Sequence, residues 1–161
     1  MITYVFLHAS WIHLLGNMIY LWTFADNVED ATGHFQFVVF FLLCAIIAAL
    51  AQAWPDPGSR SPVIGASGGL AGVLGAYLLL HPRAEISIAI PIFVDIEIVQ
   101  LPAWVMLIGW FVFEFVLNYF AGSTGTVVAF RAHIGGFIAG MILIPFFVPD
   151  LREALRSRLS L

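Results

Sequence analysis

The stretch GASGGLAGVLGAYLLL at residues 65–80 decides the fold. It follows the proline-rich segment PDPGSRSP at 55–62, and its apolar part runs for about 14 residues from Ser67 to Leu80. At about 1.5 Å per residue, a helix of this length reaches roughly 21 Å, whereas the hydrocarbon layer of a bilayer is about 30 Å thick. The helix is too short to span a membrane, so we expect it to begin inside one, at Ser67.

The composition of the whole chain is typical of a membrane protein. Hydrophobic residues make up 61% of the 161 residues and charged residues only 10%, where soluble domains average about 25%. The formal net charge is −4, and the basic residues, all of them Arg, form no basic stripe, so nucleic acid is not an expected partner. The single Cys44 lies in an apolar run and is expected to pack as a small apolar residue.

Four other apolar runs accompany the short helix, at 4–25, 35–54, 103–120 and 132–148. Together with the run at 67–80 they predict an all-α bundle of about five transmembrane helices. The acidic stretch DNVEDATG at 26–33 predicts a turn, and residues 81–102, which contain prolines and acidic residues, predict a loop or interfacial segment. No second domain is visible, so residues 1–161 are expected to form a single transmembrane domain.

The arginines indicate which side of the membrane each loop occupies. With about five crossings, the segments 26–34, 81–100 and 149–161 share one side and carry Arg83, Arg152, Arg156 and Arg158, whereas the other side carries Arg60 and Arg131. The excess of arginine marks the first side as cytoplasmic, so we expect the C-terminus inside and the N-terminus outside. Because no cleavable signal peptide is visible, an outer N-terminus favours a chain that lacks a preceding membrane helix.

Polar residues from three helices share one depth in this arrangement. The runs at 4–25, 67–80 and 132–148 all start on the outer side, and the polar residues near their starts are His8, His13, Asn17, Ser67 and His133. His13 and Asn17 are four residues apart and lie on one helical face, whereas His8 points elsewhere. Polar groups inside a membrane are stable only where protein or a water-filled cavity surrounds them. We therefore expect one water-filled cavity lined by these side chains.

Glycines would bring the helices of this cavity together. Gly65, Gly68, Gly69, Gly72 and Gly75 line the short helix, and Gly136 and Gly140 form a small-xxx-small face one turn below His133. Such faces let helix backbones approach closely, which would bring Ser67 within hydrogen-bond reach of His133. A serine hydroxyl is a weak nucleophile unless a base lies next to it, and this pair would meet that need.

Other interpretations of these residues remain open. A lone serine in a membrane helix usually bonds back to a carbonyl, and His8 fits a supporting or interfacial role. Five histidines raise the question of a metal, but the chain contains no H-x-x-x-H pair, so neither a metal nor another cofactor is expected. Polar cavity residues would also suit a small transporter or channel subunit, although the chain shows no inverted repeat. Glu114, within the run at 103–120, is expected to be neutral or paired.

Three segments together resemble the rhomboid family of intramembrane serine proteases, in its common bacterial type. They are HASWIHLLGNMIYLW at 8–22, GASGG at 65–69 and AHIGGFIAG at 132–140, and the resemblance covers essentially the whole chain. It implies a Ser–His dyad in which Ser67 is the nucleophile and His133 the general base. It also implies that His13 and Asn17 stabilise the oxyanion, with the Ser67 backbone N–H as a third donor.

The resemblance also assigns supporting roles near the dyad. It implies that His8 has a structural, hydrogen-bonding role, and that Gly136 and Gly140 pack the two dyad helices together, with Gly65 and Gly68 close to the site. The chain departs from the family pattern at two places. It starts just before the helix expected to carry His8 and His13, so the first helix of a six-helix core is expected to be missing, and Ala71 stands where the family often has an aromatic residue.

The function that this resemblance implies is an intramembrane serine endopeptidase. Its substrates would be other membrane proteins, cleaved in or beside their transmembrane segments, and its partners would be those proteins and the lipid bilayer. The alternative within the same family is a catalytically inactive protein that binds membrane-protein clients. The expected location is a bacterial inner membrane. The sequence does not indicate an oligomeric state.

Overall fold

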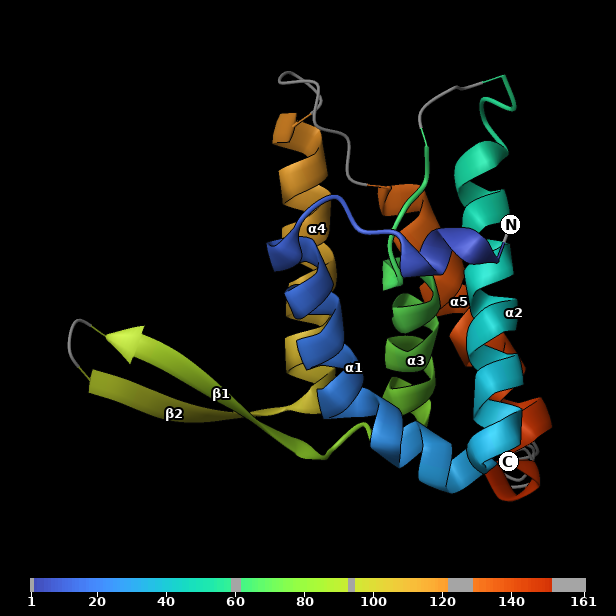
Figure 1. Cartoon of the computed structure of the whole chain (residues 1–161). Helices are drawn as coiled ribbons and strands as arrows, with labels where there is room; N and C mark the ends of the chain where they lie inside the picture. Colours follow the sequence, from blue (N-terminus) through green and yellow to red (C-terminus); the bar gives the residue numbers. More distant parts are fainter. Residues whose placement is uncertain (1, 59–61, 93–94, 122–128, 152–161) are drawn as a thin grey trace. The chain divides into compact units, whose positions relative to one another are not determined.

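The computed structural model describes residues 2–58, 62–92, 95–121 and 129–151, and helices predominate among them (Figure 1). The chain forms two compact units. One comprises Met1–Leu80 with Ala129–Leu161, and the other comprises His81–Val128. The first unit carries every residue proposed above for the cavity. The expectation of a single domain over residues 1–161 stays a prediction.

The N-terminal helical segment is interrupted. The short 3-10 helix η1 (Thr3–Phe6) precedes α1 (Trp11–Thr32), and residues 7–10 between them are not helical. Ser10 is the N-cap of α1, because its side chain accepts a hydrogen bond from the backbone N–H of His13 at 3.1 Å. The expectation of one continuous helix over 4–25 is therefore wrong, and His8 lies before α1 rather than within it.

The end of α1 also differs from the expectation. Residues 26–33 were expected to form a turn, yet the helix continues to Thr32. Ala25, Val28 and Thr32 recur at helical spacing and are all buried, so the apolar periodicity outweighs the turn preference of the acidic residues. The chain changes direction only at Gly33, whose φ of 86° lies in the left-handed region that favours glycine.

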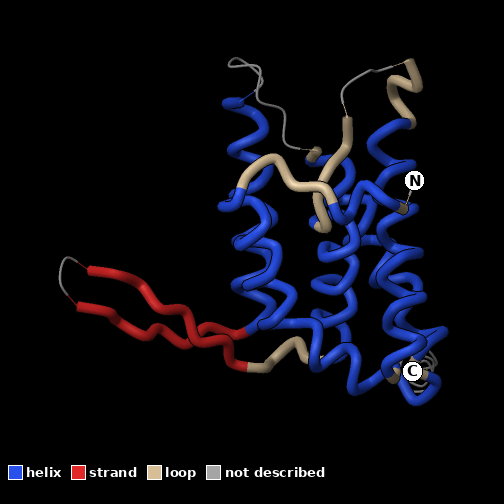
Figure 2. Tube along the Cα trace, in the orientation of Figure 1, coloured by secondary structure: helices blue, strands red, loops and turns tan. Residues whose placement is uncertain are grey.

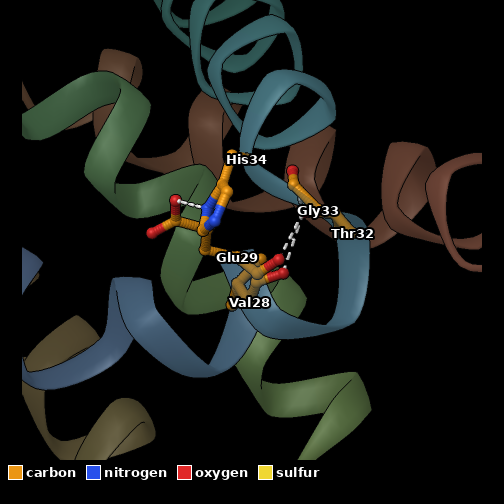
Figure 3. Close-up of polar contacts among 5 residues, drawn as sticks. All are labelled: Val28, Glu29, Thr32, Gly33 and His34. Carbon is orange, nitrogen blue, oxygen red and sulfur yellow. Dashed lines mark hydrogen bonds and ion pairs between the residues drawn. The ribbon is translucent and has the colours of Figure 1, made fainter.

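Local polar contacts hold the corner between α1 and α2 (His34–Ala53), as Figure 3 shows. The hydroxyl of Thr32 donates to the Val28 carbonyl at 2.9 Å, and the Gly33 N–H donates to the Glu29 carbonyl at 2.6 Å. The His34 ring contacts the Glu29 carboxylate, but the His34 side chain is 92% exposed. An ion pair with so exposed a partner contributes little stability, so the hydrogen bonds of the backbone define this corner.

The helix α3 (Ser67–Leu80) lies at the centre of the first unit. Its bounds agree with the apolar run expected at 67–80, and every residue from Gly68 to Tyr77 is buried. It packs against α1, α2 and α5 (Phe130–Phe147), which surround it in Figure 1. Because neighbouring helices cover α3 on several sides, its apolar residues follow no single stripe.

Two helices in the described part of the chain, α2 and α5, are long and apolar enough to cross a membrane. The other apolar helices found there, α3 and the Ala103–Val116 part of α4, are shorter. Large apolar side chains on the outside of α1, such as Trp11 and Trp22, are 85% exposed, as expected of a surface that lipid covers. The fold is therefore mostly helical and agrees with a helical membrane fold, and the count of five transmembrane helices stays a prediction.

The second unit contains a β-hairpin that the sequence reading missed. Strands β1 (Glu85–Ile92) and β2 (Asp95–Pro102) pair antiparallel, with Glu85 opposite Pro102, and α4 (Ala103–Ala121) follows directly; Figure 2 shows the two strands in red. The fold is therefore mostly helical rather than all-α, and a hairpin stands where a loop was one expectation for 81–102, while the interfacial position that was the other stays a prediction. Isoleucine recurs at every second position of β1, a strand period that outweighs the prolines and acidic residues.

Candidate active site

Ser67 and His133 are in contact. Ser67 is the first residue of α3, and His133 lies in the first turn of α5, where its side chain is 5% exposed. The Nε2 atom of His133 lies 2.8 Å from the Oγ atom of Ser67. A neutral imidazole in this position accepts a hydrogen bond from the serine hydroxyl, which is the geometry that a general base needs in order to remove the serine proton.

A close backbone approach of α3 and α5 produces this contact. A Cβ atom added to Gly136 would overlap the Gly68 carbonyl oxygen, and one added to Gly140 would overlap the Gly72 carbonyl oxygen. The two helices therefore meet backbone to backbone at these two glycines. Ser67 and His133 stand at the end of this glycine contact and are brought together by it.

Small residues of α2 pack against the glycines of α3. A Cβ atom on Gly68 would lie 2.7 Å from the Cβ atom of Ala48, and one on Gly72 would meet the Cys44 side chain. Cys44 is fully buried and reduced, so it packs as a small apolar residue, as expected. Ala71 is buried within the same contact and lies against Gly136.

The loop that leads into Ser67 has a backbone conformation that requires glycine. Gly65 has a φ of 108°, and its N–H donates to the Tyr4 carbonyl oxygen at 3.1 Å. A Cβ atom at Gly65 would lie 2.8 Å from both Cε1 and Nε2 of His13. The peptide two residues before the serine is therefore pressed against the His13 ring.

His13 and Asn17 present hydrogen-bond donors beside this loop. The Ala9 N–H donates to Nδ1 of His13 at 3.4 Å, so the neutral ring carries its own proton on Nε2. Asn17 is 6% exposed, and its Nδ2 atom has no hydrogen-bond partner among the described residues. A buried amide donor without a partner costs about 1–3 kcal/mol, and a reacting group that binds there would recover that cost.

His8 lies next to the His13 ring. The two imidazole rings make an edge-to-face contact with centroids 5.1 Å apart. Within the described residues, Nε2 of His8 is buried and has no hydrogen-bond partner. The packing agrees with a supporting position, and the hydrogen-bonding role expected for His8 stays a prediction.

Two polar residues that the sequence reading passed over also contact this region. The Tyr4 hydroxyl donates to the Ala45 carbonyl of α2 at 2.7 Å, and Oε1 of Gln52 accepts from the Ala132 N–H of α5 at 3.3 Å. Each is a polar side chain inside or beside an otherwise apolar run. That isolation is the signal that could have marked both of them, because polar groups in such runs need partners within the protein.

Replacing Tyr4 with Phe tests the first of these contacts. The loss of a single neutral hydrogen bond costs about 1 kcal/mol, which lowers the melting temperature of a domain of this size by roughly 2–4 °C. The backbone bond between Tyr4 and Gly65 remains, so the geometry at Ser67 is retained. Thermal unfolding in detergent checks this, with the exposed Tyr119→Phe as the control; an equal melting temperature for both variants contradicts it.

No group of three histidine, cysteine, aspartate or glutamate side chains in the described ranges lies close enough to hold a metal ion. The polar groups at the site are instead a hydroxyl, imidazoles and an amide. These groups suit acyl transfer, in which a serine attacks a carbonyl and nearby donors stabilise the resulting oxyanion.

Known proteins resemble the chain over most of its length. Residues 1–150 match the sequence model of the rhomboid domain family. Rhomboid protein 1, mitochondrial, of Saccharomyces cerevisiae is 29% identical over 95% of this chain and 42% of its own length. Rhomboid-like protease 3 of Toxoplasma gondii is 28% identical over 94% of the chain and 52% of its own length. Rhomboid-like protein 11, chloroplastic, of Arabidopsis thaliana is 27% identical over 89% of the chain and 50% of its own length.

These relatives bear on the size and the location of the protein. The chain spans about half the length of the curated relatives it matches. Two of them are named as mitochondrial or chloroplastic proteins, so the comparisons support a membrane location but not the bacterial inner membrane expected from the sequence. Because the rhomboid match extends over far more than half of the sequence and includes α1, α3 and α5, this chain belongs to the rhomboid family.

Proposed function

We propose that the chain is an intramembrane serine endopeptidase that cleaves other membrane proteins in or beside their transmembrane segments. The observation that carries the proposal is the 2.8 Å contact between Nε2 of His133 and Oγ of Ser67. Membership of a family that includes a named protease supports it. A serine without such a partner would be inert at neutral pH.

The proposed reaction proceeds through an acyl-enzyme. His133 takes the hydroxyl proton as Oγ of Ser67 bonds to the carbonyl carbon of the scissile peptide. When the tetrahedral intermediate collapses, the C–N bond breaks, and His133 returns the proton to the leaving amine. Water then attacks the Ser67 ester, His133 takes a proton from that water, and the second collapse releases the acid and returns the proton to Ser67.

Donors beside Gly65 would stabilise the negative oxygen of each tetrahedral intermediate. We assign this role to the Nε2–H of His13, the side-chain amide of Asn17 and the backbone N–H of Ser67. The buried, unpartnered Nδ2 atom of Asn17 supports the assignment, because a preorganised donor is what an oxyanion site requires. Loss of one such donor lowers kcat by about 10²–10³.

The substrates of this reaction are expected to be membrane segments that unwind easily. In a stable helix the scissile carbonyl is hydrogen-bonded and surrounded by side chains, so the serine cannot reach it. Small or helix-breaking residues near the cleavage point make local unwinding less costly. The preferred sites should therefore contain such residues in or beside a transmembrane segment.

Reconstitution with a membrane-protein substrate tests this proposal. The protein is placed in liposomes with a single-span substrate that carries Gly and Ala near one end of its transmembrane segment, and the products are identified by mass spectrometry. We expect cleavage at one or a few bonds in or beside that segment. Binding of the intact substrate without any cleavage would instead favour the inactive, client-binding alternative.

A further inference from the structure

The N-cap residue of α5 provides no side-chain cap for the first turn of the helix. Its N-cap is Ala129, which makes no side-chain capping bond, and the early N–H groups of any helix have no partner one turn back. The Ala132 N–H is shared: it donates to the Ala129 carbonyl at 2.9 Å and to Oε1 of Gln52 at 3.3 Å. Shared donors of this kind are common at helix ends. Gln52 of α2 thus supplies from another helix the side-chain acceptor that Ala129 lacks.

The residue held in this way is next to His133. One turn further along α5 the two helices are also in close contact, because a Cβ atom added to Gly135 would meet the Ala51 side chain of α2. That contact sets the distance between the two helices. Ala132 lies three residues before Gly135 and Gln52 follows Ala51, so the Gln52 bond extends the contact of the two helices to the first turn of α5. At that turn, Oε1 of Gln52 supplies a polar contact from α2.

We propose that Gln52 is a positioning residue for the general base, and that its Oε1 atom holds the first turn of α5 so that His133 stays in contact with Ser67. This inference rests on the proposed function. Gln52 touches neither the substrate nor the reacting atoms in this account. Its effect therefore belongs to the chemical step and not to substrate binding.

The size of the effect follows from the geometry. Displacing a catalytic group by about 1 Å from its productive position costs as much as 10²-fold in rate. The Gln52→Leu substitution keeps the approximate volume of the side chain and removes the acceptor. We expect it to lower kcat by about 10–100-fold and to leave KM within about twofold of the wild-type value. Gln52→Glu retains an acceptor oxygen and should restore kcat to within about threefold.

The experiment compares kcat, KM and melting temperature for wild type, Gln52→Leu, Gln52→Glu and Gln36→Leu. Gln36 lies on the exposed start of the same helix, so Gln36→Leu measures how much a glutamine-to-leucine substitution in α2 changes kcat and melting temperature by itself. The expected result is a loss of kcat in Gln52→Leu alone, with rescue by Gln52→Glu, and a melting temperature of Gln52→Leu no more than about 2–4 °C below that of Gln36→Leu, which is the cost of one hydrogen bond. Hydrogen exchange of the Ala132 and His133 amides should also speed up in Gln52→Leu and stay unchanged in Gln36→Leu.

Two outcomes would overturn the inference in different ways. If wild type turns over and Gln52→Leu has the same kcat, the inference fails and the proposed function stands. The inference also fails, and the proposed function stands, if Gln52→Leu loses kcat together with a large drop in melting temperature and Gln52→Glu restores neither quantity. If wild type itself shows no turnover, the proposed function fails, and the role of Gln52 in catalysis fails with it.

Discussion

The Ser67→Ala protein is expected to lose turnover of a transmembrane substrate by at least about 10⁴-fold while remaining folded. The substitution removes Oγ, the atom that lies 2.8 Å from Nε2 of His133, and leaves no nucleophile at that position. Alanine is the best helix former, and Ser67 begins α3, so the helix itself is not disturbed. The rate of product formation in liposomes measures the effect.

Two further variants make this result specific. Ser87 stands on strand β1 in the other unit and is exposed, so Ser87→Ala should keep wild-type turnover. His133→Ala should lose nearly as much activity as Ser67→Ala, because a nucleophile and its base act as one unit and their losses are not additive. Cleavage that persists in Ser67→Ala would show that the dyad is wrongly assigned.

The Gly140→Ala protein is expected to be strongly destabilised. A Cβ atom at Gly140 would overlap the carbonyl oxygen of Gly72, so α3 and α5 must separate to accommodate a single methyl group. Overpacking of this kind costs about 3 kcal/mol, and for a domain of this size that lowers the melting temperature by roughly 6–12 °C. Separation of these helices also moves Ser67 away from His133, so activity should fall even below the melting temperature.

Gly16→Ala is the matched control for this substitution. Gly16 lies in α1, and a Cβ atom added there has no neighbouring atom within 4 Å. Because alanine is favoured over glycine in a helix by up to about 1 kcal/mol, Gly16→Ala should have an unchanged or slightly raised melting temperature. If Gly140→Ala proved as stable and as active as Gly16→Ala, the backbone contact could not be what holds the dyad together.

The central helix and its neighbours could be predicted from the sequence. The run from Ser67 to Leu80 is apolar throughout and is bounded by Gly and Pro before it and by His-Pro after it, so its limits are sharp. The pairing of Ser67 with His133 followed from their shared depth and from the glycines beside them. In the structure the two side chains are in contact, while their catalytic roles stay predictions.

Other features depended on competition between local signals. In α1 the acidic residues indicated a turn, but the burial of Val28 and Thr32 kept the helix intact up to Gly33. In the segment 81–102 the prolines and charged residues concealed the recurrence of isoleucine at every second position of β1. The contact of Gln52 with Ala132 joins residues 80 positions apart, and it depends on side-chain placement that no local pattern contains.

Identification of the residue that reacts with a fluorophosphonate probe tests the central claim most directly. The detergent-solubilised protein is labelled, digested and analysed by mass spectrometry, with His133→Ala treated in parallel. We expect an adduct on Ser67 in the wild type and its loss in His133→Ala, because the probe reacts only with a serine that a base has activated. An adduct on a different serine, or equal labelling of Ser67 without His133, would contradict it.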